Sequence, residues 1–476
     1  MSGPRTTGVE AGLDIVSPTT GERITTVPAA SEQDVVLAAE RAHQKFASGV
    51  WSGRSPRERA AVLLRLADLM ERDAETLARL DCEDAGKPLT ECRTGDVPSA
   101  IESIRWFAEA ADKVFGRVAP TGPASLGLVS REPVGVGAAI LPWNYPLAMA
   151  AWKVGPALAA GNSLLLKPAE ATPRSTLRLA ALAAEAGLPD DVLTVLTGHG
   201  SVTGRALARN PLVRALSFTG STATGRRVLA DAAETNFKRV SLEMGGKSPQ
   251  ILLPDALDYG DELIDHMTEA AFLTMGQNCT AGSRVLVHHS IAEEVLDRFT
   301  AAARSLTVGD PAAPRTRVGP LISRAALDRV AAAVDAARSA GARIHTGGLP
   351  HGLPPHGAYY PPTVVSRAPA GSAVLIDELF GPVVTVQTFT TEDEAVGLAN
   401  ATEYGLAASV WTRDLDAAFR FARRIEAGVV SVNAYSEGDI TTPFGGWKQS
   451  GFGGAEKSTD AFAQWTREKT VWIRTR

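Results

Sequence analysis

Apolar residues in the first quarter of the chain recur at intervals close to 3.6 residues. This period predicts amphipathic helices over residues 31–48, 55–72, 74–86 and 96–115. Two short strands around a Thr-Gly turn are predicted before these helices, within residues 13–27. The N-terminal part of the chain is therefore expected to be rich in helices.

The pattern changes at Val134, where short apolar runs begin to alternate with helical segments. Strands are predicted over residues 134–141, 163–166, 192–196, 215–218 and 239–242. The helix predicted over residues 173–186 begins with Pro173 after a Thr172 cap and stops at Gly187. Strands that alternate with helices predict a mostly parallel sheet with helices on both faces. Ligands bind such sheets beyond the carboxyl ends of the strands.

A second alternating series predicts a second α/β domain. Its helices are expected over residues 259–275, 291–305, 323–340, 393–400 and 414–426. Its strands are expected over residues 284–288, 382–388, 407–411 and 428–433. Residues 126–129 and 470–473 also have strand character, but they have no obvious place in either sheet and could pair with another subunit. The expected fold class is α/β, with two doubly wound (Rossmann-like) domains and a small β oligomerisation element.

Composition limits the possible partners. The chain has 476 residues, of which 45% are hydrophobic, so it is long enough for about three globular domains. Its net charge of −5 is small and its charges are interspersed, which argues against nucleic acid or a membrane surface as a partner. No apolar run approaches the ~20 residues of a membrane span and no signal peptide is evident, so a cytoplasmic location is expected. Cys82, Cys92 and Cys279 lack zinc-ligand spacing, and neither a metal site nor a disulfide framework is expected.

Cys279 lies in the stretch MGQNCTAGSR, between a predicted helix and a β-branched run. Its flanks are small or polar, and Gly276 and Gly282 would let the backbone approach a ligand closely. These features indicate an exposed nucleophile. For an isolated cysteine, a buried structural role is the more common interpretation, so other stretches of the chain must decide.

Two stretches at strand ends have features of a dinucleotide site. Residues 218–225 (FTGSTATG) join a strand to a helix, and the helix N-terminus could bind a pyrophosphate, although the spacing is not GxGxxG. Lys167 and Glu170 follow a neighbouring strand, where a carboxylate could accept hydrogen bonds from ribose hydroxyls. Taken alone, such a Lys and Glu are more often a solvated surface pair.

Glu243 and Asn144 are the other candidates for chemistry. Glu243 ends a predicted strand and precedes two glycines, so it could act as a general base or simply mark a surface strand end. Asn144 follows the first strand of the alternating series, and its amide could donate to a developing oxyanion. Asparagine is also an ordinary turn residue.

These motifs occur together and in order, and the sequence resembles the NAD(P)-dependent aldehyde dehydrogenases over essentially its whole length. The resemblance is carried by PWNYP, GNSLLLKPAE, FTGSTATG, LEMGGKSP, GQNCTAGSR, DELFGPV and PFGGWKQSG. A closer resemblance is to bacterial γ-glutamyl-γ-aminobutyraldehyde dehydrogenases and related aminoaldehyde dehydrogenases. It depends on AWKVGPALAAGNS, IRWFAEAADKVFG, NAYSEGDITTPFGG and EKTVWI.

The resemblance implies a domain organisation and an assembly. It places an NAD-binding domain in residues 1–115 and 134–243 and a catalytic domain in residues 244–450. It places an oligomerisation element in residues 116–133 and 451–476, and it implies a homodimer or homotetramer.

The resemblance also implies a mechanism. Cys279 would attack the aldehyde, Asn144 would bind the oxyanion of the thiohemiacetal, Glu243 would activate water against the thioester, and Lys153 would take part in a proton relay. NAD would be bound by Trp143, Lys167, Glu170, Gly220, Ser221, Gly245, Glu378 and Phe380. Glu170 favours NAD over NADP because a carboxylate repels the 2′-phosphate, while Lys167 leaves weaker NADP use possible.

The aldehyde tunnel implied by the resemblance has aromatic walls. The substrate residues would be Tyr145, Met149, Trp152, Asn278, Glu437, Asp439 and Phe444. Glu437 or Asp439 would recognise an amino group at the far end of the substrate; the alternative is a solvated acidic loop. The chain departs from the family after Gly451, so Glu456 matches the family's acidic residue only with a one-residue shift.

Several functions remain open at this point. The expected reaction oxidises an aliphatic amino- or γ-glutamylamino-aldehyde to the carboxylic acid. Broad-specificity, betaine-aldehyde or semialdehyde dehydrogenases are alternatives, as are a CoA-acylating enzyme, which would lack the base Glu243, and a non-catalytic structural relative.

Overall fold

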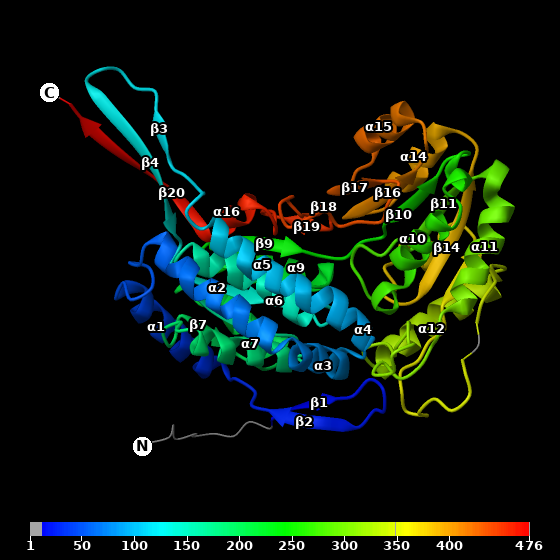
Figure 1. The fold of residues 1–476 in the computed structure, drawn as a ribbon, viewed down its shortest axis with the longest axis horizontal. Coiled ribbons are helices and arrows are strands. Elements are labelled where there is room, and N and C mark those ends of the chain that lie inside the picture. The colour runs from blue at the N-terminus through cyan, green and yellow to red at the C-terminus, as the bar shows by residue number, and fades with distance from the viewer. Residues whose placement is uncertain (1–11, 348, 476) are drawn as a thin grey trace.

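The computed structural model describes residues 12–347 and 349–475. The chain forms two α/β parts, each built on its own sheet, and a small three-stranded sheet projects from the first part (Figure 1). A hairpin of β1 (Leu13–Val16) and β2 (Arg23–Val27) precedes the first helices. The α/β fold class predicted from the alternating pattern is therefore confirmed.

The first sheet has six strands. They are β5 (Val136–Ile140), β6 (Ser163–Lys167), β7 (Leu193–Val195), β8 (Val213–Thr219), β9 (Arg239–Glu243) and β19 (Gly451–Phe452). Their order is β19-β9-β8-β5-β6-β7, and only β19 pairs antiparallel. The first five strands match the apolar runs predicted from the sequence. Strand order reverses between β5 and β8, so a crevice forms at the carboxyl ends of these strands.

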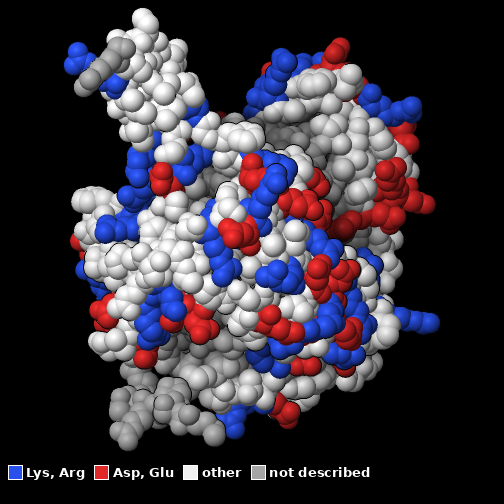
Figure 2. All heavy atoms as spheres, turned by 60° about the vertical axis from the view of Figure 1, so that its left-hand side comes forward, with Lys and Arg blue, Asp and Glu red and all other residues white. Residues whose placement is uncertain are grey.

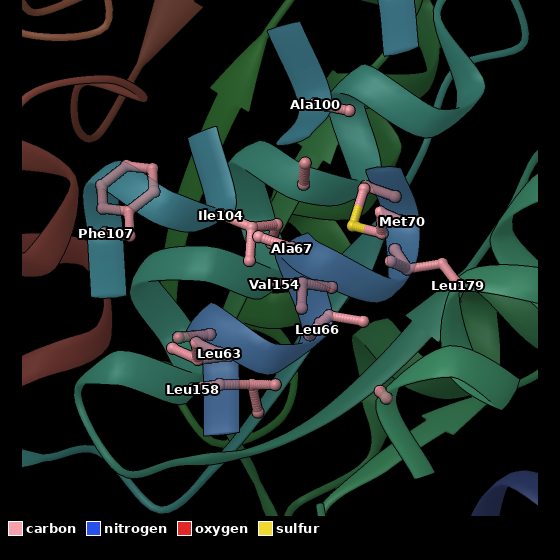
Figure 3. Packing of buried hydrophobic residues seen from close by; sticks show 14 of the residues in the cluster. Leu63, Leu66, Ala67, Met70, Ala100, Ile104, Phe107, Val154, Leu158 and Leu179 are labelled. Carbon is pink, nitrogen blue, oxygen red and sulfur yellow. The ribbon is translucent and has the colours of Figure 1, made fainter. Parts of the chain in front are cut away.

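Helices cover both faces of this sheet. They are α1 (Glu32–Ala47), α2 (Pro56–Arg72), α3 (Ala74–Ala85), α4 (Leu89–Glu91), α5 (Val97–Ala110), α6 (Pro146–Ala159), α7 (Arg174–Glu185), α8 (Arg205–Arg209), α9 (Thr222–Ala233) and α16 (Phe462–Trp465). Leu164 and Leu166 point to a core shared with α2, α5, α6 and α7, whereas Leu165 points to a core shared with α1, α8 and α9. Figure 3 shows the first of these cores, where Ala67 of α2 lies beside Ile104 of α5 and Leu66 of α2 lies beside Val154 of α6.

Two helices of the first part begin with capping boxes. Ser31 and Ser55 form capping boxes with Asp34 and Glu58 at the starts of α1 and α2. The predicted Thr172 cap of α7 is wrong, because Pro173 is the cap residue and α7 begins one residue later.

The second sheet has seven strands. They are β10 (Pro249–Leu252), β11 (Arg284–His288), β12 (Arg343–Ile344), β13 (Thr363–Ser366), β14 (Val383–Phe389), β16 (Ala407–Trp411) and β17 (Val429–Val432), in the order β12-β13-β14-β11-β10-β16-β17. Its helices are α10 (Asp261–Phe272), α11 (Ala292–Ser305), α12 (Arg324–Ser339), α13 (Ala373–Ile376), α14 (Glu392–Asn400) and α15 (Leu415–Arg424). A short ladder of β15 (Tyr404–Gly405) and β18 (Trp447–Lys448) lies beside it. The strands β10, β12 and β13 were not predicted.

The three-stranded sheet consists of β3 (Arg117–Ala119), β4 (Ser125–Pro133) and β20 (Thr466–Arg474) in the order β20-β4-β3. The strands near residues 126–129 and 470–473 therefore pair with each other within the chain, in a sheet that is separate from the two larger sheets. In the C-terminal part of the chain, only the residues from Thr466 onward belong to this sheet. Residues 451–465 instead provide β19 and α16, and Trp465 lies in the core of the first part.

The surface carries charges of both signs. The face shown in Figure 2 has Lys and Arg side chains interspersed with Asp and Glu. Among the described helices, none combines the length and the apolar composition needed to cross a membrane.

Candidate active site

A cavity of about 910 Å³ extends between the two α/β parts. The ends of four strands of the first sheet contribute residues to its wall, among them Lys167 at the end of β6, Thr219 at the end of β8 and Glu243 at the end of β9. The second part contributes Cys279 and Glu378. Residues far apart in the sequence therefore meet at the position where parallel sheets bind ligands.

Cys279 lies in the connection from α10 to β11 and lines this cavity. The helix ends at Phe272, three residues earlier than predicted, because Thr274 and Met275 have left-handed φ angles of +52° and +57°. These strained residues turn the chain toward the cavity. The side chain of Cys279 is half-buried, whereas Cys82 and Cys92 are buried in the helical core.

The two glycines beside Cys279 have a different role from the predicted one. A Cβ atom on Gly276 would lie 2.3 Å from the carbonyl oxygen of Gly381, and one on Gly282 would lie 2.7 Å from the Gln250 side chain. These glycines are therefore required by contacts within the protein and not by the approach of a ligand.

The thiol of Cys279 is surrounded by acidic groups. Burial raises its pKa well above the usual value, and Glu437, Glu378 and Glu243 raise the pKa further. The Sγ atom lies 3.8 Å from Asn278 Oδ1, to which it donates. The thiol is therefore neutral near pH 7 in the free protein and needs a base or a positive charge before it can attack a carbonyl carbon.

Asn144 lines the cavity just beyond the end of β5. Its Nδ2 atom donates to the carbonyl oxygen of Gln277, two residues before Cys279, over 2.9 Å. An amide nitrogen carries two hydrogens, so this bond orients the side chain and leaves one hydrogen for a ligand.

Glu243 is 5% exposed, and its Oε2 atom has no hydrogen-bond partner among the described residues. Burial raises the pKa of Glu243 well above its usual value, and the Glu456 carboxylate raises it further. Lys153 and the N–H of Gly446 act in the opposite direction on this pKa. A buried carboxyl group with one unpartnered oxygen at a cavity wall is typical of a group that exchanges protons with a ligand.

Lys153 and Glu456 form an ion pair, and both side chains are buried. Gly453 and Gly454, which precede Glu456 in the chain, have φ angles of +84° and +158°. A Cβ atom on Gly453 would lie 2.1 Å from a carbonyl oxygen of β9. This turn allows the N–H of Glu456 to donate to the carbonyl oxygen of Phe444 over 2.7 Å, next to Glu243.

The predicted cofactor residues of the first sheet line one arm of the cavity. Ser221 is the cap residue of α9, and its side chain accepts from Thr224 N, so the helix N-terminus faces the cavity. Lys167 is almost fully buried, and burial lowers its pKa to about 8. Glu170 accepts from Gly200 N over 2.7 Å and from His199 Nδ1 over 3.1 Å.

The remaining cofactor residues lie where the two parts of the protein meet. Trp143 and Phe380 line the cavity with their ring centroids 5.3 Å apart, edge to face. Gly246 N donates to Glu378 Oε1 over 3.0 Å, and a Cβ atom on Gly245 would lie 2.0 Å from Glu378 Oε2. Burial raises the pKa of Glu378 to about 7.

The other arm of the cavity has an aromatic wall and an acidic group. The predicted residues that line this arm are Tyr145, Met149, Trp152, Asn278, Glu437 and Phe444. Glu437 accepts from Thr280 Oγ1 and from Asn278 Nδ2. Tyr435, which the sequence reasoning missed, also lines the cavity and accepts from Asn278 Nδ2 over 2.8 Å.

Asp439, the other acidic residue considered for recognition of the amino group, lies outside the cavity wall. Its side chain is exposed, does not line the cavity, and accepts from Thr441 N over 2.9 Å as part of a turn. Lys457, whose role the sequence did not indicate, is buried and donates to the carbonyl oxygens of Glu437 and Gly438 over 2.7 and 3.0 Å. Lys457 therefore fixes the backbone of the loop that carries Glu437.

No group of three or more His, Cys, Asp or Glu side chains in the described part of the chain is arranged to bind a metal ion.

Comparison with known proteins gives matches over nearly the whole chain. Residues 5–471 match the model of the aldehyde dehydrogenase family. The aminoacetaldehyde dehydrogenase of Pseudomonas aeruginosa is 46% identical, over 96% of this chain and 91% of the relative. Two crystal structures cover 93% or more of both chains. The first is a γ-glutamyl-γ-aminobutyraldehyde dehydrogenase from Burkholderia cenocepacia, which is 46% identical, with a TM-score of 0.94 over 98% of this chain and 94% of that chain. The second is the P. syringae indole-3-acetaldehyde dehydrogenase AldA in complex with NAD+, which is 43% identical, with a TM-score of 0.95 over 97% of this chain and 93% of that chain.

These matches confirm the resemblance inferred from the sequence motifs, including the likeness to aminoaldehyde dehydrogenases. The chain belongs to the aldehyde dehydrogenase family.

Proposed function

We propose that this protein oxidises an aliphatic aldehyde that carries an amino or γ-glutamylamino group to the carboxylic acid, with reduction of NAD. The observation that carries this proposal is the meeting of Cys279, Asn144 and Glu243 at one cavity, whose other arm has the features of a dinucleotide site. These three residues come from distant parts of the chain and provide a nucleophile, an oxyanion donor and a base.

The residues of the cofactor arm fit NAD. The N-terminus of α9 suits a pyrophosphate, and Glu170, with its carboxylate oriented by two donors, suits the two hydroxyl groups of a ribose. A 2′-phosphate would meet the negative charge of Glu170, so we expect NAD to be preferred over NADP. NAD, when bound, accepts the hydride that leaves the substrate carbon.

The first half of the reaction would take place at Cys279. The thiol would first lose its proton to water in the cavity. Its sulfur then forms a bond to the aldehyde carbon, and the electron pair of the carbonyl bond moves to the oxygen, which becomes an oxyanion. Asn144 Nδ2 and the N–H of Cys279 would bind this oxyanion. Loss of hydride from the same carbon then leaves a thioester on Cys279.

The second half would depend on Glu243. Its carboxylate removes a proton from a water molecule, which attacks the thioester carbon and releases the carboxylic acid and the Cys279 thiolate. The buried pair of Lys153 and Glu456 lies next to Glu243 and would carry the proton onward. The presence of a base supports hydrolysis rather than transfer of the acyl group to coenzyme A.

The substrate arm supports an amino-substituted aldehyde. Trp152 and Phe444 lie edge to face with centroids 5.4 Å apart, and such rings suit an aliphatic chain. Glu437 on the wall and Glu269 also lining the cavity would attract an ammonium group. The names of the relatives from P. aeruginosa and B. cenocepacia point to the same substrate class.

We also propose that the three-stranded sheet mediates assembly into a homodimer or homotetramer. Its strand β20 carries exposed Val471, Trp472 and Ile473 at the edge of the sheet. Exposed apolar residues on an unpaired strand edge suit contact with another subunit.

The proposal is tested by product analysis with aminoaldehydes of increasing chain length. NADH and the carboxylic acid should form in equal amounts, and Cys279→Ala should abolish both. Cys82→Ala, which changes a buried cysteine in the helical core, is the matched control and should keep the activity. Formation of acyl-CoA on addition of coenzyme A, or NADH formation by Cys279→Ala, would contradict the proposal.

A further inference from the structure

Lys87 is fully buried at the junction between α3 and α4, close to the cavity but not part of its wall. Its Nζ atom lies 2.5 Å from Asp96 Oδ2 and donates to the backbone carbonyl oxygen of Asn144 over 3.1 Å. The same ammonium group lies 3.6 Å from the centre of the Tyr145 ring. One side chain therefore contacts both residues that open the substrate arm after β5.

The ammonium group of Lys87 is charged in this environment. Burial alone would lower its pKa, but Asp96, Cys92 and Glu91 outweigh burial and raise the pKa above its ordinary value. An ammonium group has three donors, and here a carboxylate, a carbonyl oxygen and an aromatic face surround it. A buried charge is costly unless it is paired in this way, so its place beside the cavity calls for a function.

The contacts of Lys87 extend to the segment that carries the nucleophile. The hydroxyl of Tyr145 is 3.1 Å from Thr274 Oγ1, and Glu91 accepts from Thr274 N over 3.1 Å. Thr274 is one of the two strained residues before Cys279. The backbone of Asn144 is thus fixed by Lys87, while the Asn144 side chain is oriented by the carbonyl oxygen of Gln277.

We propose that Lys87 is a positioning residue that fixes the backbone of Asn144, so that the Asn144 amide points at the oxyanion formed on Cys279. This inference rests on the oxyanion role of Asn144 given above. Lys87 touches neither substrate nor cofactor, and it acts only through Asn144 and the ring of Tyr145. The fixed backbone matters because a displacement of ~1 Å at a reacting group can reduce the rate about 100-fold.

The test begins with Lys87→Met, which keeps the length of the side chain and removes its donors and charge. The rate of the first turnover, followed as NADH formation at saturating aldehyde, should fall roughly 10- to 100-fold. The affinity for NAD should be nearly unchanged, because the contacts of Lys87 are with Asp96, Asn144 and Tyr145 and not with a residue of the cofactor arm. Lys238→Met is the matched control: Lys238 is also buried and donates to a backbone carbonyl oxygen, but it lies outside the cavity, so its loss should leave this rate within about twofold.

The decisive readout is the double-mutant cycle with Asn144→Ala. If Lys87 acts through Asn144, adding Lys87→Met to Asn144→Ala should slow the first turnover by less than about twofold. Losses that multiply, or a normal first turnover in Lys87→Met alone, would overturn the inference. If Lys87→Met yields no folded protein, Lys87→Gln enters the same cycle, because it keeps a polar group near Asp96 but is too short to reach the Asn144 carbonyl oxygen.

The cycle also separates this inference from the proposed function. Asn144→Ala alone tests the oxyanion role, and an unchanged first turnover in that variant would refute this role and the inference together. A slow Asn144→Ala combined with independent effects of Lys87→Met would refute only the inference about Lys87.

Discussion

Recognition of an ammonium group by Glu437 can be tested by removing its charge alone. Thr280 and Asn278 donate to Oε1, so Oε2 is the oxygen that can accept from a substrate ammonium group. A hydrogen bond to a charged group contributes about 1.5–3 kcal/mol. The side chain of Glu437 is only half-buried, so solvent screening places the contribution in the lower part of this range, about 1.5–2 kcal/mol. Because each 1.4 kcal/mol is tenfold, Glu437→Gln should lose roughly 10- to 30-fold in kcat/KM on an aminoaldehyde.

The assay compares an aminoaldehyde with an uncharged aldehyde of equal length. Glu437→Gln also removes a charge that raises the pKa of Cys279, but this effect is common to both substrates. The change on the aminoaldehyde, measured relative to the uncharged aldehyde, should therefore be the roughly 10- to 30-fold loss in kcat/KM. Asp439→Asn is the matched control, because Asp439 lies two residues away on the same loop but its exposed side chain does not line the cavity. Equal losses on both substrates in Glu437→Gln, or a selective loss in Asp439→Asn, would refute the reasoning.

Three further predictions concern the base, the cofactor and the nucleophile. Activity needs the deprotonated form of Glu243, so Lys153→Met, which removes a group that lowers the pKa of Glu243, should move the rising limb of the kcat profile to higher pH. Glu456→Gln removes a group that raises this pKa and should move the limb to lower pH; shifts in the same direction would contradict the assignment. Glu170→Ala should lower the NAD/NADP ratio of kcat/KM, and an unchanged ratio would show that Glu170 does not meet the ribose. Because the pKa of Cys279 is raised, its alkylation in the free protein should still accelerate with pH above 8, and a plateau below pH 8 would contradict the burial found here.

The first sheet could be predicted well because its central strands are buried on both faces and appear as continuous apolar runs. The strand β10 was missed since it begins with Pro249 and Gln250, residues that are common in loops. In the fold, Gln250 Nε2 donates to the carbonyl oxygen of Gly282 over 2.7 Å, so a polar side chain is accommodated in a central strand. That contact joins residues distant in the sequence, and no local pattern could indicate it.

The residues of the candidate site could also be predicted only in part from the sequence. Strand ends located Asn144 and Glu243, because parallel strands end at one edge of a sheet. Loop residues are not placed by such a rule. The sequence therefore could not show which of Glu437 and Asp439 faces the cavity. The involvement of Lys87 was equally hidden, since its partners Asp96 and Asn144 meet it only through packing of α5 against α6.

The central claim is that an acyl group passes through Cys279 and is released by Glu243. The most direct measurement is the intact mass of Glu243→Gln after incubation with an aminoaldehyde and NAD, followed by peptide mapping. The account predicts one equivalent of NADH and an added mass equal to the acyl group on the peptide that contains Cys279. An unmodified Cys279 in a variant that still produces NADH at each turnover would contradict it.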